Sequence, residues 1–149
     1  MKKISIGSDH GGFQLKEYLK ENLSINYEII DEGCFSTDST DYPIFAQKVA
    51  KDIETNKADL GIVVCTSGIG VSIVANKVKR VRCALCTSLD MAEKSRLHND
   101  ANVLALGKMN QSFEEALEIA KTFLSTEFSN EERHIRRIKE IITIEGENN

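Results

Sequence analysis

Residues 60–70 read Leu-Gly-Ile-Val-Val-Cys-Thr-Ser-Gly-Ile-Gly. The first part, Leu60–Cys65, carries no charge and consists of small or β-branched residues and one leucine, which predicts a strand buried on both faces of a parallel sheet. Residues 66–70 then form a loop that contains two glycines. Beyond it, apolar residues recur at the spacing of a helix face as far as Val78. These residues are Val71, Val74, Ala75 and Val78.

A strand, a glycine loop and a helix start together make a place where an anion can bind. The first N–H groups of a helix have no partner within it, and the helix dipole attracts negative charge. Cys65 ends the strand beside these groups, where a thiolate could act as a base or a nucleophile. A buried structural cysteine in an ordinary turn explains the same residues equally well.

The remaining segments alternate between strand and helix patterns. Asp41 with Pro43, and the capping boxes Ser112–Glu115 and Ser129–Glu132, mark helix starts. This alternation predicts one α/β domain over residues 1–149: a three-layer α/β/α sandwich with a Rossmann-like five-stranded parallel sheet and an extended C-terminal helix. The expected strands are 3–7, 27–31, 60–65, 82–86 and 102–106, and the expected helices end near Leu23, Ile53, Val78, Leu97, Leu124 and Ile144.

Composition limits the function classes. The 149 residues are 41% hydrophobic and 28% charged, as in a soluble globular protein, and the net charge is −4. An acidic chain is a poor candidate for nucleic-acid binding. The start, MKKISIGSDH, is too charged for a signal sequence, and no apolar run reaches membrane-spanning length. We therefore expect a cytoplasmic protein with no membrane or nucleic-acid partner.

The four cysteines show no disulfide or metal pattern. They stand at positions 34, 65, 83 and 86, and the cytosol would keep them reduced. Cys83 and Cys86 have CxxC spacing, but in a strand their side chains would point to opposite faces. We expect no zinc site and no other metal.

Polar residues of catalytic type are expected at one edge of the sheet. Ligands of parallel sheets bind at the carboxyl ends of the strands. Asp9 and His10 follow the first strand, the Cys65 loop follows the third, and His98 with Asn99 lies beyond the fourth. We expect all three groups to converge. The alternatives are a turn cap for Asp9 and a helix-end charge for His98, and a Cys–His hydrolase would use the same residue types.

The last helix has two different sides. Arg133 and Arg137 stand four residues apart and project from one side, where they could grip a phosphate or form a solvated basic face. The charge pattern alone favours the solvated face. The roughly opposite side is expected to be buried, and it carries Ile135, Ile138, Ile141 and Ile142.

Six motifs in register resemble one family, the B-type ribose-5-phosphate isomerases, which are grouped with the bacterial isomerases of allose and galactose 6-phosphates. The resemblance extends over essentially the whole chain. The motifs are Gly7–Gly12, Thr40–Pro43, the Cys65 loop, Ala75–Lys77, His98–Asn102 and Arg133–Arg137.

The resemblance implies an aldose–ketose isomerase, an intramolecular oxidoreductase that uses no metal and no cofactor. It makes Cys65 the base, Ser67 part of the loop that stabilises the enediolate, and His98 the group that opens the sugar ring. Asp9 would orient hydroxyl groups. The family builds dimers or tetramers in which one chain's Cys loop meets the other chain's His98 and Asn99. Substrate binding falls on Asp9, His10, Tyr42, Thr66, Ser67, Gly68, Ile69, Gly70, Asn99, Arg133 and Arg137, of which His10, Arg133 and Arg137 match phosphate-binding positions.

Three segments depart from the family pattern and concern the choice of sugar. Thr66 stands where the family's Cys-Gly-Thr-Gly loop has glycine, Lys108–Met109 replaces an expected arginine, and residues 130–132 replace a pair of glycines. The first substrate pair to expect is ribose 5-phosphate and ribulose 5-phosphate, in the non-oxidative pentose phosphate pathway. The alternatives are allose or galactose 6-phosphate, or a sugar-phosphate-binding subunit without activity.

Overall fold

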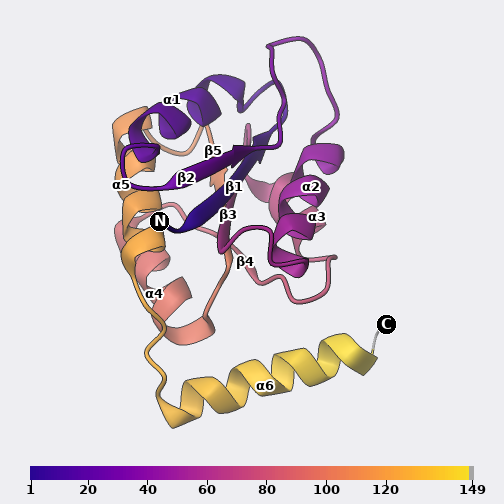
Figure 1. The fold of residues 1–149 in the computed structure, drawn as a ribbon, viewed down its shortest axis with the longest axis vertical. Coiled ribbons are helices and arrows are strands. Elements are labelled where there is room, and N and C mark those ends of the chain that lie inside the picture. The colour runs from indigo at the N-terminus through magenta and orange to yellow at the C-terminus, as the bar shows by residue number, and fades with distance from the viewer. Residues whose placement is uncertain (148–149) are drawn as a thin grey trace.

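A parallel sheet forms the centre of the computed structural model, which describes residues 1–147 (Figure 1). Within these residues the sheet has five strands in the order β2-β1-β3-β5-β4, and every neighbouring pair is parallel. The predicted parallel sheet is therefore confirmed. The strands are β1 (Lys3–Ser8), β2 (Glu28–Asp31), β3 (Leu60–Cys65), β4 (Cys83–Leu85) and β5 (Val103–Gly107).

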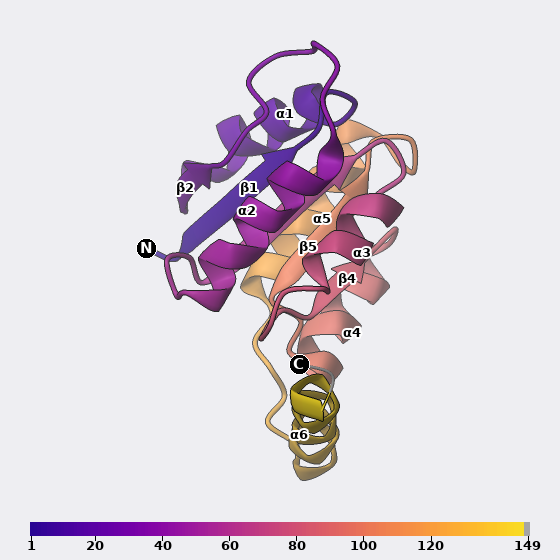
Figure 2. The ribbon, with the colours of Figure 1, turned by 90° about the vertical axis from the view of Figure 1, so that its right-hand side faces the viewer.

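Helices cover both faces of the sheet, which confirms the three layers. Helices α1, α4 and α5 lie on one face and α2 and α3 on the other, whereas α6 extends away from the sheet (Figures 1 and 2). No helix within residues 1–147 is both long and apolar enough to span a bilayer. The helices are α1 (Phe13–Leu23), α2 (Tyr42–Glu54), α3 (Ile69–Ala75), α4 (Leu89–Asn99), α5 (Phe113–Ser125) and α6 (Glu132–Glu147).

The two hydrophobic cores divide the side chains of β3 between them. Ile62 and Val64 face the core beneath α1 and α5, and Val63 and Cys65 face the core beneath α2 and α3. All six residues of β3 are buried, because both of its faces are covered. Cys83 and Cys86 likewise contact opposite cores, as the strand pattern predicted.

Helix α3 ends at Ala75, three residues before the predicted end near Val78. Asn76 ends the helix, because its side-chain NH₂ donates to the Cys83 carbonyl and its side-chain oxygen accepts the Cys83 N–H. Val78 remains buried without being helical. At α5 the predicted cap at Ser112 is confirmed, since the Glu115 N–H donates to Ser112 Oγ, but the Glu115 carboxylate accepts the Ser112 hydroxyl and not the backbone N–H of a full capping box.

Two expectations for α6 are wrong. Ser129 and Glu132 form no capping box, because α6 begins at Glu132 itself. Ser129 Oγ instead accepts the Glu131 N–H and lies within hydrogen-bond distance of His134 Nδ1. The isoleucine side of α6 is also buried only in part. Ile138 is 8% exposed, but Ile141 and Ile142 are 42% and 50% exposed, because α6 stands away from the sheet (Figure 2).

Candidate functional site

The carboxyl ends of β1 and β3 lie side by side, and the chain leaves them toward opposite faces of the sheet. Strand β1 leads into α1 and strand β3 into α3, which is the kind of switch point where ligands of parallel sheets bind. Asp9–His10 follow β1, and Cys65–Gly70 end β3 and begin α3. These are the residues for which the sequence predicted chemistry.

The Cys65 thiol lies within a loop of backbone donors. The Gly68 N–H donates to Cys65 Sγ at 3.1 Å, and the Ile69 N–H donates to Ser67 Oγ at 3.2 Å. Gly68 has a φ of +81°, a left-handed conformation that leads the chain from this turn into α3. Helix α3 has only 7 residues, so these local N–H groups, rather than a long helix, provide the positive field. The arrangement suits a thiolate beside a developing oxyanion.

The Asp9 turn closes against this loop. The Asp9 carboxylate is buried and accepts the Gly12 N–H at 3.0 Å, and the Asp9 N–H donates to the Val64 carbonyl. The Thr66 side chain lies against Gly11, where a Cβ would overlap with Thr66 Oγ1. The threonine that departs from the family pattern therefore joins the two loops by contact.

Tyr42 and His10 complete this edge. A Cβ on Gly70 would come within 2.5 Å of the Tyr42 ring, so the ring lies over the first turn of α3. The His10 N–H donates to Thr40 Oγ1 at 2.9 Å, which attaches the segment before α2 to the Asp9 turn. One edge of the sheet thus brings together Asp9, His10, Tyr42, Cys65, Thr66, Ser67, Gly68, Ile69 and Gly70.

The segment after β5 is hydrogen-bonded to the backbone carbonyls of the Cys65 loop. The Lys108 N–H donates to the Cys65 carbonyl at 2.9 Å, the Met109 N–H to the Thr66 carbonyl at 3.0 Å, and the Asn110 side chain to the Ser67 carbonyl at 3.0 Å. The role of Asn110 was missed from the sequence. The signal that could have found it is the position of β5 beside β3, which brings the residues after both strands together.

His98 and Asn99 do not lie at this edge, so the expected convergence of all three groups within one chain is wrong. Helix α4 starts at the carboxyl edge after β4 and returns to the start of β5, so its last residues, His98 and Asn99, lie at the amino edge. A helix that joins two parallel strands must make this return.

The amino edge carries a basic cluster. The rings of His98 and His134 lie 4.5 Å apart between centroids, and Ser129 Oγ lies 2.7 Å from His134 Nδ1. Burial lowers the pKa of His134, and the charges of His98 and Arg133 lower it further. Arg133 pairs with Glu131 at 3.1 Å, and Arg137 is exposed. The structure therefore groups His98 with the arginines of α6, apart from Cys65.

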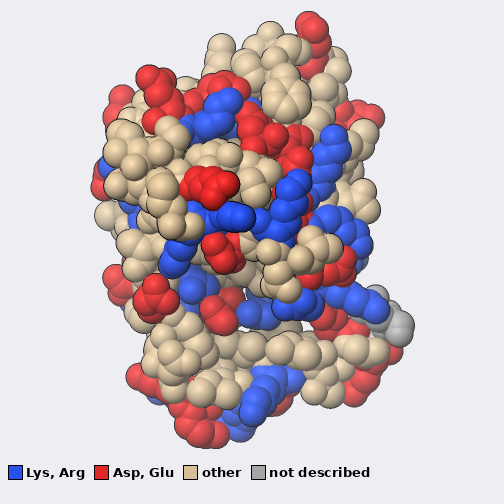
Figure 3. Space-filling view, in the orientation of Figure 1, with Lys and Arg blue, Asp and Glu red and all other residues tan. Residues whose placement is uncertain are grey.

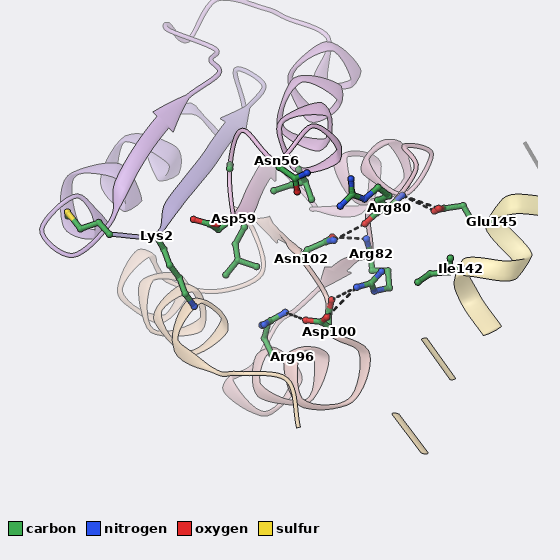
Figure 4. Close-up of a pocket in the computed structure, with 14 residues that line it drawn as sticks. Lys2, Asn56, Asp59, Arg80, Arg82, Arg96, Asp100, Asn102, Ile142 and Glu145 are labelled. Atoms are coloured by element: carbon green, nitrogen blue, oxygen red, sulfur yellow. Dashed lines mark hydrogen bonds and ion pairs between the residues drawn. The ribbon is translucent and has the colours of Figure 1, made fainter. Parts of the chain in front are cut away.

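A cavity of about 860 Å³ opens near this cluster, between the amino edge and α6 (Figure 4). Figure 3 shows basic side chains gathered above the hollow between the body and α6. The arginines of the cavity are used structurally. Arg82 donates to the Asn99 and Asp100 carbonyls at 3.0 Å, and Arg96 donates to the Asp100 carboxylate at 2.8 Å. These bonds of Arg82 and Arg96 fix the turn that follows His98, whereas Arg80 donates to the Glu54 carbonyl at 3.0 Å.

Known proteins of similar sequence and fold are sugar-phosphate isomerases. A family model described as Ribose/Galactose Isomerase matches residues 4–141. The chain is 39% identical over 150 residues to ribose-5-phosphate isomerase B of Escherichia coli (strain K12), with 100% of each chain covered. Ribose-5-phosphate isomerase B of Clostridium thermocellum has a TM-score of 0.96 at 46% identity, with 99% of each chain covered. The enzyme of Mycoplasma genitalium, solved with bound ribulose 5-phosphate, has a TM-score of 0.92 at 40% identity, with 97% of each chain covered.

Proposed function

Because this chain belongs to the Ribose/Galactose Isomerase family, we propose that it interconverts ribose 5-phosphate and ribulose 5-phosphate, a step of the non-oxidative pentose phosphate pathway. The observation that carries the proposal is the Cys65 thiol, which lies at the end of a central strand beside the N–H groups of its own loop. The relatives named as ribose-5-phosphate isomerases support this choice of sugar.

The reaction follows from the groups at this edge. The Cys65 thiolate takes the proton from C2 of the open-chain aldose, and the electron pair moves through C1 to the carbonyl oxygen. A proton then passes from O2 to O1, and the thiol returns its proton to C1, which gives the ketose and restores the thiolate. Aimed backbone donors stabilise the enediolate oxygen by about 3 kcal/mol each. Ser67 and the N–H groups of residues 68–70 are the proposed donors, and Asp9 orients the sugar hydroxyls.

The remaining groups come from a second copy of the chain. We infer a homodimer, or a homotetramer built from such dimers, in which His98 opens the ring while Asn99, Arg133 and Arg137 bind the same sugar phosphate as the partner's Cys65. Two observations support this. The Cys65 loop and the group that contains His98 lie at opposite edges of the sheet in one chain. The exposed isoleucines of α6 also form an apolar surface that a second chain could bury. His10, Tyr42 and Thr66 complete the binding side of the Cys65 loop.

We also propose that residues 1–149 act as a single domain in the cytoplasm, without metal or cofactor. The family match over residues 4–141 supports the single domain. The cysteines at 34, 65, 83 and 86 are all free, and a reducing compartment keeps a catalytic thiol in its active form.

The test is isomerisation in deuterated water without added metal. Wild-type protein should convert ribose 5-phosphate to the ketose, with any deuterium confined to C1 or C2, and Cys65→Ala should not. Cys83→Ala is the matched control: this thiol lies on β4, burial raises its pKa to about 12, and its loss should leave the rate unchanged. Absence of ketose from wild-type protein would overturn the ribose assignment. Turnover of allose or galactose 6-phosphate instead would make that sugar phosphate the assigned substrate. Binding without turnover would indicate a non-catalytic subunit.

A further inference from the structure

The Thr40 residue lies against both the backbone and the ring of His10. The His10 N–H donates to Thr40 Oγ1 at 2.9 Å, and the Thr40 N–H donates to His10 Nδ1 at 3.1 Å. Two more atoms of Thr40 lie near the same ring nitrogen, the carbonyl oxygen at 3.2 Å and Oγ1 at 3.5 Å. Nδ1 is therefore fully engaged with Thr40, and Nε2 is the ring nitrogen left for a ligand.

The chemistry of these contacts decides where the neutral ring carries its proton. A backbone N–H can only donate, so a neutral ring that receives it has a bare Nδ1 and a protonated Nε2. The Thr40 hydroxyl accepts from the His10 N–H, so its own proton is also free to be directed at Nδ1. One fixed donor, the Thr40 N–H at 3.1 Å, and one fixed acceptor, the Thr40 carbonyl at 3.2 Å, thus face Nδ1, and the hydroxyl at 3.5 Å can serve as either. Since Thr40 is only partly buried, water can serve that carbonyl instead.

We propose that Thr40 is a positioning residue whose peptide N–H holds the neutral His10 ring as the tautomer with its proton on Nε2. The ring then offers a hydrogen-bond donor without needing to be charged. Such a donor suits the acceptor-only oxygens of a phosphate. The identity of this ligand rests on the proposed function, whereas the tautomer does not.

The tautomer can be read directly by nitrogen NMR. The chain has 3 histidines, so ¹⁵N-labelled protein gives few ring signals, and His10→Asn identifies those of His10 by their loss. At a pH where the rings are neutral, we expect a pyridine-type shift at Nδ1 and a pyrrole-type shift at Nε2 of His10. The reverse pattern, or equal averaged shifts, would overturn the proposal. Because no substrate is present, an inactive protein that shows the expected pattern would contradict the proposed function alone.

Two substitutions separate the peptide from the hydroxyl. Thr40→Pro removes the N–H but keeps the carbonyl, so the ring should move toward the Nδ1–H tautomer. The KM for ribose 5-phosphate should then rise about tenfold, the equivalent of one hydrogen bond to a charged group, with little change in kcat. Thr40→Val keeps the peptide and should keep the Nε2–H tautomer. An unchanged tautomer in Thr40→Pro, or a lost one in Thr40→Val, contradicts the role of the peptide. If Thr40→Pro does not fold, the wild-type and Thr40→Val spectra still decide.

Discussion

The sulfur of Cys65 accepts a hydrogen bond from the Gly68 N–H at 3.1 Å. Gly68 precedes α3, and its φ of +81° directs the chain from the turn beside Cys65 into that helix. The same turn leaves no space for a side chain. A Cβ on Gly68 would lie 2.6 Å from Leu85 Cδ1 and 2.9 Å from the Gly107 nitrogen. The thiol and its donor are thus linked through a residue that must be glycine.

Gly68→Ala should therefore damage both stability and activity. A residue with a Cβ costs about 1–2 kcal/mol in the left-handed conformation, and the overlap with the Gly107 backbone adds to this. Any relaxation of the loop moves the N–H away from Cys65, so kcat should fall by about a hundredfold, the equivalent of one lost oxyanion donor. Urea denaturation and steady-state kinetics measure the two effects.

Gly146→Ala is the matched control for this substitution. Gly146 lies in α6, and among residues 1–147 no atom of another segment or side chain lies within 4 Å of its added Cβ. Alanine is the better helix former by about 1 kcal/mol, so this variant should be as stable as wild type or slightly more stable. If both alanine variants behave alike, the conformation of Gly68 does not matter and the prediction is wrong.

Lys16→Met should destabilise the fold by about 3 kcal/mol, because it leaves a largely buried carboxylate with one cation fewer. The Lys16 side chain is 0% exposed, and its ammonium group lies 2.8 Å from Asp31 and 3.0 Å from Glu17. Burial alone would raise the pKa of Asp31, but hydrogen bonds from Lys16 and Lys20 outweigh it and lower the pKa. Asp31 in turn accepts the Gly33 N–H at 2.9 Å, at the start of the loop that leads to Thr40.

Lys20→Met tests whether the burial of Lys16 causes the loss of stability expected in Lys16→Met. Lys20 binds the same two acids at 2.9 and 3.0 Å, but its side chain is 36% exposed. A pair that water reaches contributes less than about 1 kcal/mol, so this variant should lose much less stability. Equal losses in the two unfolding curves would show that the shared acids, and not the burial of Lys16, govern the effect.

The contribution of His134 to stability should fall on acidification. Its pKa lies below the ordinary value of 6.5, because burial, His98 and the arginines of α6 disfavour the charged ring. Glu131 favours the charged ring but does not outweigh them. The unfolded chain therefore binds the proton more readily, so the contribution is complete above about pH 6.5 and is lost as the pH falls through the lowered value. The stability difference between wild type and His134→Asn should shrink between about pH 7.5 and pH 5. A difference that grows toward acid would contradict this sign.

The sequence was sufficient to predict the sheet and its buried centre, but not the strand order. Every residue of Leu60–Cys65 is apolar because helices cover both faces, and that cause is visible in the run itself. The position of β5 between β3 and β4 depends on packing between distant segments. For the same reason the contact from Asn110 to the Ser67 carbonyl was missed.

The candidate site was predicted correctly where a residue directly follows a strand. Asp9 and Cys65 share an edge because β1 and β3 are parallel neighbours. His98 was misplaced because it ends a helix, and a helix between parallel strands returns to the other edge. The isoleucines of α6 were expected to be buried from their spacing alone. That spacing identifies an apolar side but not whether the same chain covers it.

The division of the proposed site between two chains predicts that two inactive variants restore each other. A Cys65→Ala chain keeps His98, and a His98→Asn chain keeps Cys65. In a mixed dimer, one of the two sites receives both intact residues. Equal co-expression should then give about a quarter of the wild-type activity, since about half of the dimers are mixed and each has one complete site.

The control for this experiment is a mixture in which no complete site can form. Co-expression of Cys65→Ala with a double variant, Cys65→Ala/His98→Asn, provides it and should remain inactive. A further variant, Ile142→Asp, places a charge on the exposed apolar side of α6 and should reduce both dimer formation and activity, which light scattering and kinetics can follow together. Recovery only in the first mixture requires that Cys65 and His98 act from different chains. If that mixture stays inactive although mass spectrometry detects mixed dimers, the shared site is wrong, and the basic cluster at the amino edge would need another role.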